Sequence, residues 1–203
     1  MQRVHPKSER LAGALANQAA QAGLYPLARQ RLQDFNSLGS QIQNKTIDCL
    51  ENKLLHNSQL ELKNKSTFIV DNYITLGLID LANLGLDDKC AFSSYKFITW
   101  LDDFFQQATM SNNNRQLLMM YKAHFQWKEN QPKHAIETLK KIFLINKKNP
   151  VPLFLACEWA IDKNIKKTIN ELCQKSIAVA NQSPYKYNTL KSSVLKKLDH
   201  LTK

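Results

Sequence analysis

The sequence predicts an all-α protein, and three observations support this prediction. Apolar residues recur at helical spacing along most of the chain, and no stretch alternates between apolar and polar residues as a half-buried strand does. Only 5 glycines and 6 prolines occur in 203 residues, too few for the many turns of an all-β protein. The prolines fall where helices begin or separate, the positions at which a missing amide proton costs least.

The periodicity predicts ten helices joined mostly by short connections, which favour antiparallel helix hairpins. We expect the helices near residues 8–22, 25–38, 42–56, 66–84, 88–107, 113–129, 133–147, 151–163, 165–181 and 186–201. The polar stretch that begins "NSQLELKNK" interrupts this pattern. We therefore expect three parts: an N-terminal hairpin with a following helix at 1–56, a polar loop at 57–65, and a longer helical array at 66–203.

No window holds about 18 consecutive apolar residues, so the sequence predicts no membrane-spanning helix. The N-terminal stretch lacks the apolar block of a secretory signal and is interpreted as the first helix of the fold. The four cysteines are far apart and form no CxxC pair, which predicts reduced core thiols and a cytoplasmic protein. They are Cys49, Cys90, Cys157 and Cys173.

The net charge of +11 is concentrated in the C-terminal part of the chain. From Lys128 to Lys203 there are 15 Lys against 6 Asp and Glu, and no arginine follows Arg115. Arginine binds phosphates and bases through two parallel hydrogen bonds, whereas lysine is a hydrated point charge. The pattern therefore favours a solvated basic face over a surface that reads nucleic-acid sequence.

A short stretch near the N-terminus indicates a helical repeat. The pair Leu15-Ala16 precedes a turn at Gly23-Leu24-Tyr25, and Ala28 follows in the next helix. Small residues at such positions let two helix backbones approach closely. The stretch resembles a tetratricopeptide repeat (TPR), a unit of about 34 residues that forms a helix–turn–helix.

Similar repeat-like positions occur farther along the chain. Ala135 occupies the small position of the second helix, and Ile169 lies one TPR repeat length beyond it. Ala91 belongs to a looser match. In the last segment the apolar stripe of residues 190–201 has lysines beside it, as in a solenoid's capping helix. We therefore expect antiparallel helix hairpins stacked as a short TPR-like solenoid, with an irregular helical bundle as the alternative because the spacing is uneven.

Motifs of known catalytic chemistry are missing from the sequence. It contains no phosphate-binding glycine loop, HExxH or GxSxG motif, and its five histidines are scattered. The pairs Asp87-Asp88 and Asp102-Asp103 do not complete the DDxxD motif of isoprenoid synthases. We expect no enzymatic activity, no metal and no cofactor. Asp80 lies in an almost wholly apolar helix, so it either faces a binding groove or has a Lys or amide partner.

The TPR resemblance implies a non-enzymatic scaffold or adaptor that binds a peptide or a partner's helix in a concave groove. Transferring the family's groove positions to this chain gives Arg10, Asn17, Gln21, Met119, Trp127, Phe154 and Glu158. Trp127 and Phe154 are equally well explained as core residues. The alternative function is binding of nucleic acid or another acidic surface through the lysine-rich half. A third possibility is docking within a larger assembly, for instance one in the cell envelope.

Overall fold

A computed structural model describes residues 8–51, 68–87, 94–183 and 185–201. The chain divides into two compact units, Met1–Leu118 and Met119–Lys203, and the division falls within one helix. The described residues are mostly helical, which confirms the all-α prediction. The predicted loop at 57–65 lies outside the described residues. The predicted boundary there stays a prediction, and the helices before and after it belong to the same unit.

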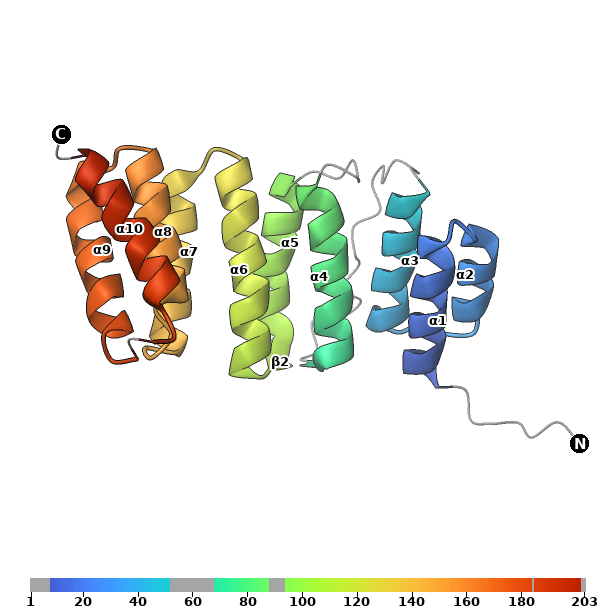
Figure 1. The fold of residues 1–203 in the computed structure, drawn as a ribbon. Helices are drawn as coiled ribbons and strands as arrows, with labels where there is room; N and C mark the ends of the chain where they lie inside the picture. The colour runs from blue at the N-terminus through green and yellow to red at the C-terminus, as the bar shows by residue number, and fades with distance from the viewer. Residues whose placement is uncertain (1–7, 52–67, 88–93, 184, 202–203) are drawn as a thin grey trace, which may run out of the picture. The chain divides into compact units, whose positions relative to one another are not determined.

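The helices follow the predicted order (Figure 1). The first unit contains α1 (Glu9–Gln21), α2 (Tyr25–Leu32), α3 (Leu38–Leu50), α4 (Asn72–Leu86), α5 (Ser94–Gln107) and the start of α6 (Asn112–Lys128). The second contains the rest of α6, α7 (Pro132–Ile145), α8 (Val151–Asp162), α9 (Lys166–Ala180) and α10 (Asn188–Leu201). Helix α3 begins earlier than expected because the Ser37 hydroxyl caps it.

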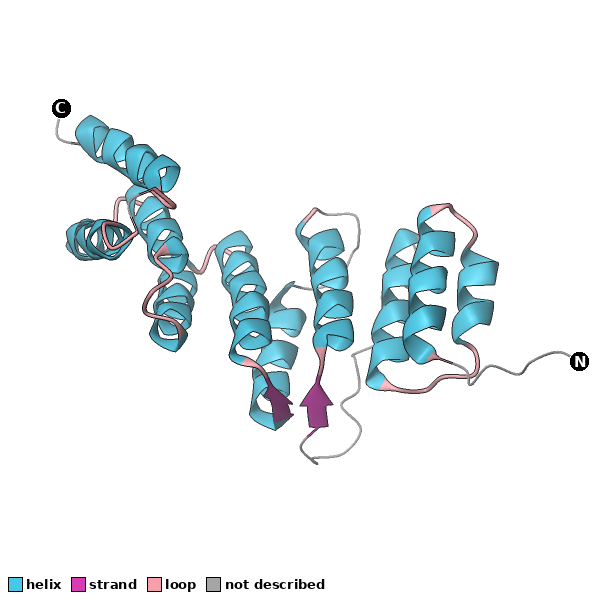
Figure 2. Cartoon of the chain, turned by 60° about the horizontal axis from the view of Figure 1, so that its bottom comes forward, coloured by secondary structure: helices cyan, strands magenta, loops and turns pink. Residues whose placement is uncertain are grey.

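Two short strands were not expected from the sequence. β1 (Phe68–Val70) and β2 (Ala108–Met110) pair in parallel, with Phe68 opposite Ala108 (Figure 2). Strands this short cannot show a period of two, so a sequence pattern cannot reveal them. The Asp71 side chain accepts a hydrogen bond from the amide of Ile74 and caps α4. The helix therefore starts after β1, and the prediction of helix throughout 66–84 was wrong for residues 68–71.

Three helix hairpins turn in the same way. Gly23, Asn130 and Asn164 each follow a helix and have positive φ values of 77°, 55° and 52°. In each case the backbone amide of the residue after the turn residue donates to the carbonyl five positions before that amide. This is the hydrogen bond of a Schellman motif. The spacing from Asn130 to Asn164 is the TPR repeat length. The predicted turn at Gly23 is thus confirmed, and two asparagines repeat its geometry.

The predicted small positions are buried in these hairpins. Five residues after each turn residue stand Ala28, Ala135 and Ile169, all at most 6% exposed. Seven residues before each turn residue stand Ala16, Ala123 and Cys157, all 0% exposed. The matching positions therefore lie at helix contacts in every hairpin, as the close approach of two backbones requires. Ala91 lies outside the described residues.

Helices of successive pairs also lie beside one another in a constant register. In the second unit His124 on α6 contacts Trp159 on α8, and Glu158 on α8 contacts Ser193 on α10. The two pairs have the same separation in sequence, which is close to one repeat length. In the first unit a Cβ on Gly39 of α3 would lie 2.5 Å from the ring of Tyr73 on α4, again one repeat length along the chain. Farther along each pair, Trp127 lies beside Lys163, Asp162 beside Lys197, and Ile42 beside Gly77. Because later residues of one helix meet later residues of the other, α6, α8 and α10 run in the same direction, as do α3 and α4.

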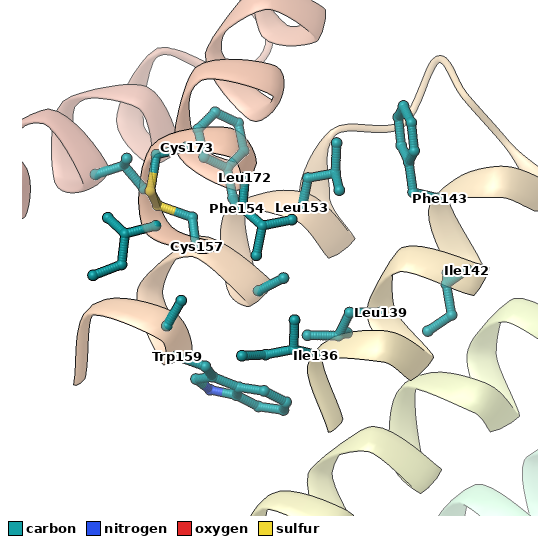
Figure 3. Close-up of a cluster of buried hydrophobic side chains, with 14 of the residues drawn as sticks. Ile136, Leu139, Ile142, Phe143, Leu153, Phe154, Cys157, Trp159, Leu172 and Cys173 are labelled. Carbon is teal, nitrogen blue, oxygen red and sulfur yellow. A yellow bond between two sulfur atoms is a disulfide. The ribbon is translucent and has the colours of Figure 1, made fainter. Parts of the chain in front are cut away.

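The core of the second unit contains a disulfide between Cys157 on α8 and Cys173 on α9 (Figure 3). Both residues are fully buried beside Leu153, Phe154 and Leu172. Cys49 is disulfide-bonded as well. The prediction of reduced thiols was therefore wrong, because sequence separation says nothing about which positions of a hairpin face each other.

In the part of the chain that the structure describes, no helix has the length and apolar character needed to cross a membrane.

Candidate interaction surface

An aromatic cluster joins α6 to α8 in the second unit. The indoles of Trp127 and Trp159 stack with ring centroids 4.6 Å apart and an interplanar angle of 14°. The His124 ring packs edge-on against Trp159, at a centroid distance of 5.2 Å. Trp159 is buried at 7% exposure, whereas Trp127 and His124 are partly exposed. Stacking on a fixed indole holds the exposed part of Trp127 in one orientation, so it is presented with little loss of side-chain entropy.

Charged and neutral groups border this cluster. The exposed Lys163 places its ammonium 5.5 Å from the centroid of the Trp127 ring and donates to the Asn130 amide oxygen at 3.2 Å. Burial lowers the pKa of His124, so its imidazole is neutral at pH 7. The surface around Trp127 therefore offers an apolar ring beside a lysine cation, an arrangement that suits an apolar side chain next to a carboxylate.

Helix α10 neutralises the acidic groups of α8. The Lys197 ammonium lies 3.5 Å from a carboxylate oxygen of Glu158 and 3.7 Å from one of Asp162. The Ser193 hydroxyl donates to Glu158 at 3.1 Å. Val194 of α10 is fully buried in the same core. Glu158 is therefore engaged within the fold, which leaves it less available to a partner than the sequence suggested.

The other predicted groove residues of the second unit have different environments. Met119 and Trp127 are partly exposed and pack against the core from α6. Phe154 is only 1% exposed and is a core side chain, as Figure 3 shows. Of the two explanations that the sequence left open for Phe154, burial in the core is the one that its position supports. We therefore leave Phe154 out of the proposed surface.

The remaining three predicted residues lie on α1 in the first unit. Gln21 is exposed and Asn17 is partly exposed. Arg10 is exposed and forms an ion pair with Asp71, the residue that caps α4. Backbone hydrogen bonding to Ile74 lowers the pKa of Asp71, and the Arg10 guanidinium adds to this effect. Arg10 thus has a structural contact that its sequence position did not indicate.

Tyr73 forms a tight junction between three helices of the first unit. Its ring occupies the space that a Cβ would need at Gly13 on α1 and at Gly39 on α3. The phenol oxygen is buried and has no hydrogen-bond partner in the described part of the chain. Burial and the charges of Glu9 and Asp71 raise the pKa of Tyr73 to about 12. The phenol is therefore protonated, and its role is to fill space between α1, α3 and α4.

Asp80 on α4 is half-buried, and it forms no hydrogen bond or ion pair with any described residue. Burial raises the pKa of this carboxyl. A Lys or amide partner, one of the two explanations given for it above, is thus not seen among the described residues. Within the part of the chain that the structure describes, the carboxylate is thus half-buried without a charged or hydrogen-bonding partner.

The groove residues predicted from the sequence did not include Trp159, His124 and Lys163, which complete the surface around Trp127. The signal was available, because Trp159 follows Trp127, and Lys163 follows Asn130, at close to one repeat period.

No cluster of three or more metal-binding side chains occurs among the described residues. Comparisons with known proteins found no matching family model, no similar curated protein and no similar solved structure.

Proposed function

We propose that the chain is a non-enzymatic interaction protein built from TPR-like helix hairpins. One observation carries this proposal: the recurring register of α6, α8 and α10, in which contacting residues lie 32 to 39 positions apart, close to one repeat length. The repeated turns at Asn130 and Asn164 support it, because stacked identical hairpins produce such a register. In this interpretation α10 is the capping helix, with Leu195 and Lys196 on its exposed side.

The proposed partner is a peptide or a helix of another protein that contacts α6 and α8. Trp127 supplies the central apolar contact, and Lys163 supplies a charge beside it. A partly exposed tryptophan held by stacking is a frequent origin of large binding energies at protein interfaces. Met119 lies on α6 as well and is partly exposed.

The disulfides favour an oxidising compartment over the cytoplasm that the sequence suggested. Disulfides in proteins of mesophiles persist outside the cytosol, where glutathione and thioredoxin do not reduce them. We therefore place the proposed scaffold in a periplasmic, secretory or extracellular setting. Docking within an envelope-associated assembly is compatible with that setting.

The test is capture of partners with the wild type, Trp127→Ala and Tyr185→Ala, followed by mass spectrometry. Tyr185 is 94% exposed and serves as the matched control for loss of a surface aromatic side chain. We expect Trp127→Ala to lose partners that Tyr185→Ala retains, with an affinity loss of about tenfold or more. Equal binding by all three proteins contradicts the proposal. Circular dichroism establishes that Trp127→Ala is folded.

A second candidate function is binding to an acidic polymer through the C-terminal half. The 15 lysines between Lys128 and Lys203 favour it, because clustered cations attract polyanions in a salt-dependent way. A gel shift with duplex and single-stranded DNA at low and moderate salt tests the nucleic-acid version. The absence of any shift at low salt rules that version out.

A further inference from the structure

The outer face of α7 is a basic stripe with one apolar side chain in it. The exposed residues Lys133, Glu137, Lys141, Leu144 and Lys148 are spaced by three or four positions. On an α-helix this spacing places Lys133, Glu137, Lys141 and Leu144 along one side, and Lys148 follows in the turn after the helix ends. Leu144 is 62% exposed, although the opposite side of α7 is packed in the core. Leu144 is thus an apolar side chain that this unit leaves mostly exposed among lysines.

The single acidic group of the stripe is already neutralised. Glu137 forms an ion pair with Lys140 of the same helix, with 2.9 Å between the ammonium nitrogen and a carboxylate oxygen. Lys175 of α9 places its ammonium 5.3 Å from the ring centroid of Phe143, the neighbour of Leu144. Besides the lysines of the stripe, Lys175 thus adds a cation beside α7, and the one carboxylate of the stripe, Glu137, is paired with Lys140.

We propose that this face of α7 binds an acidic segment of a partner protein that also presents an apolar side chain to Leu144. The proposal deepens the second candidate function by naming the face and the class of partner. Charge complementarity argues for an acidic partner, and the exposed leucine supplies the apolar centre that protein interfaces have inside a polar rim.

Two other polyanions fit this face less well. Nucleic acid offers phosphates, which arginine binds best through two parallel hydrogen bonds. The basic residues of this part of the chain include lysines and no arginine. Leu144 would gain nothing from a phosphate backbone. A membrane-bound helix buries a whole apolar side in the lipid, whereas the apolar side of α7 is occupied by the core through Ile136, Leu139 and Ile142.

The probe is a fluorescent glutamate-rich peptide with leucine at every fourth position, compared with the same peptide carrying serine there. The full chain is titrated at low and moderate salt by fluorescence anisotropy. We expect Lys133→Glu with Lys141→Glu to weaken binding about tenfold or more. The control, Lys166→Glu with Lys196→Glu, has the same net charge and changes exposed lysines on α9 and α10. It is expected to weaken binding about threefold at most.

Leu144→Ser separates the apolar contact from the charge. We expect it to weaken binding of the leucine peptide about fivefold and to leave the serine peptide unchanged. Leu195→Ser on α10, where the leucine is 41% exposed, is the matched control and leaves both unchanged. No binding of the leucine peptide at low salt overturns the proposal, and so does equal weakening by the two double variants. Tighter α7-dependent binding of duplex DNA or of vesicles containing phosphatidylserine also overturns it.

Trp127→Ala is expected to bind the leucine peptide as the wild type does. The proposal for the α7 face and the proposal for the Trp127 surface can therefore be tested separately. Loss of peptide binding in Trp127→Ala would assign the peptide to the α6–α8 surface instead and would overturn the proposal for α7.

Discussion

Asn130 and Asn164 adopt the same left-handed backbone conformation, one repeat length apart, each at the turn between two helices. Asparagine tolerates this conformation better than other residues with a Cβ, although glycine tolerates it best. Gly23 fills the same place in the first hairpin. The three turns thus show a repeated backbone requirement that two different residue types satisfy.

This requirement gives a direct prediction for Asn164. Replacing it with glycine leaves stability unchanged or raises it slightly, whereas Asn164→Ala costs about 1 kcal/mol because alanine is strained at positive φ. Urea unfolding followed by circular dichroism measures the difference. Asn36, an exposed loop residue, has no positive φ, and Asn36→Ala is the control for loss of an asparagine. Equal stability of Asn164→Ala and Asn164→Gly would contradict the prediction.

Gly13 and Tyr73 give a second prediction, because the Tyr73 side chain fills the space that glycine leaves at position 13. Alanine normally stabilises a helix interior by about 1 kcal/mol relative to glycine. Gly13→Ala is expected to destabilise instead, by about 2 kcal/mol, since the new methyl group collides with the Tyr73 ring.

A double-mutant cycle separates this collision from other effects. In a Tyr73→Ala background the ring is gone, and Gly13→Ala is then expected to stabilise by about 1 kcal/mol. The unfolding midpoints of the four proteins in urea give both numbers. The same cost of Gly13→Ala in both backgrounds would show that Tyr73 is not the cause.

The disulfide between Cys157 and Cys173 gives a third prediction. It closes a loop with a sequence separation of 16. Replacing both residues with serine is expected to lower stability by about 3 kcal/mol, through the freedom gained by the unfolded chain. The corresponding positions in the preceding hairpin are Ala123 and Leu139, both fully buried.

That correspondence supplies a matched variant. Cys157→Ala with Cys173→Leu copies the earlier hairpin and fills the core with apolar groups, so it is expected to recover part of the loss. Urea unfolding without reductant compares the three proteins. A serine variant that unfolds at the wild-type urea concentration would show that the disulfide does not stabilise the fold.

The sequence predicted the helices well because amphipathic periodicity is a local property. The turn at Gly23 and the small positions at Ala28 and Ala135 could also be predicted, since each residue type has one evident steric reason. The Cys157–Cys173 bond could not, because it depends on which positions of two helices face each other. For the same reason the groove positions were only partly useful: Phe154 points into the core, and Glu158 is engaged by α10.

Asp80 gives the last prediction, a dependence of stability on pH. Burial raises the pKa of its carboxyl in the folded chain, so between the unfolded and the folded pKa the native state binds more protons than the unfolded state. This group's contribution to stability therefore falls as the pH rises through that interval, and the full penalty remains at neutral pH. Asp80→Asn removes the charge with little change in shape.

We expect Asp80→Asn to be more stable than the wild type at pH 7, by about 0.5 kcal/mol after allowance for solvent screening of a half-exposed group. The difference is expected to vanish at a pH below the unfolded pKa, where the aspartate is protonated in both states. Thermal unfolding at several pH values measures it, with Asp103→Asn as the control at an exposed site. A wild type that is more stable than Asp80→Asn at neutral pH would show that the carboxylate has a favourable partner after all.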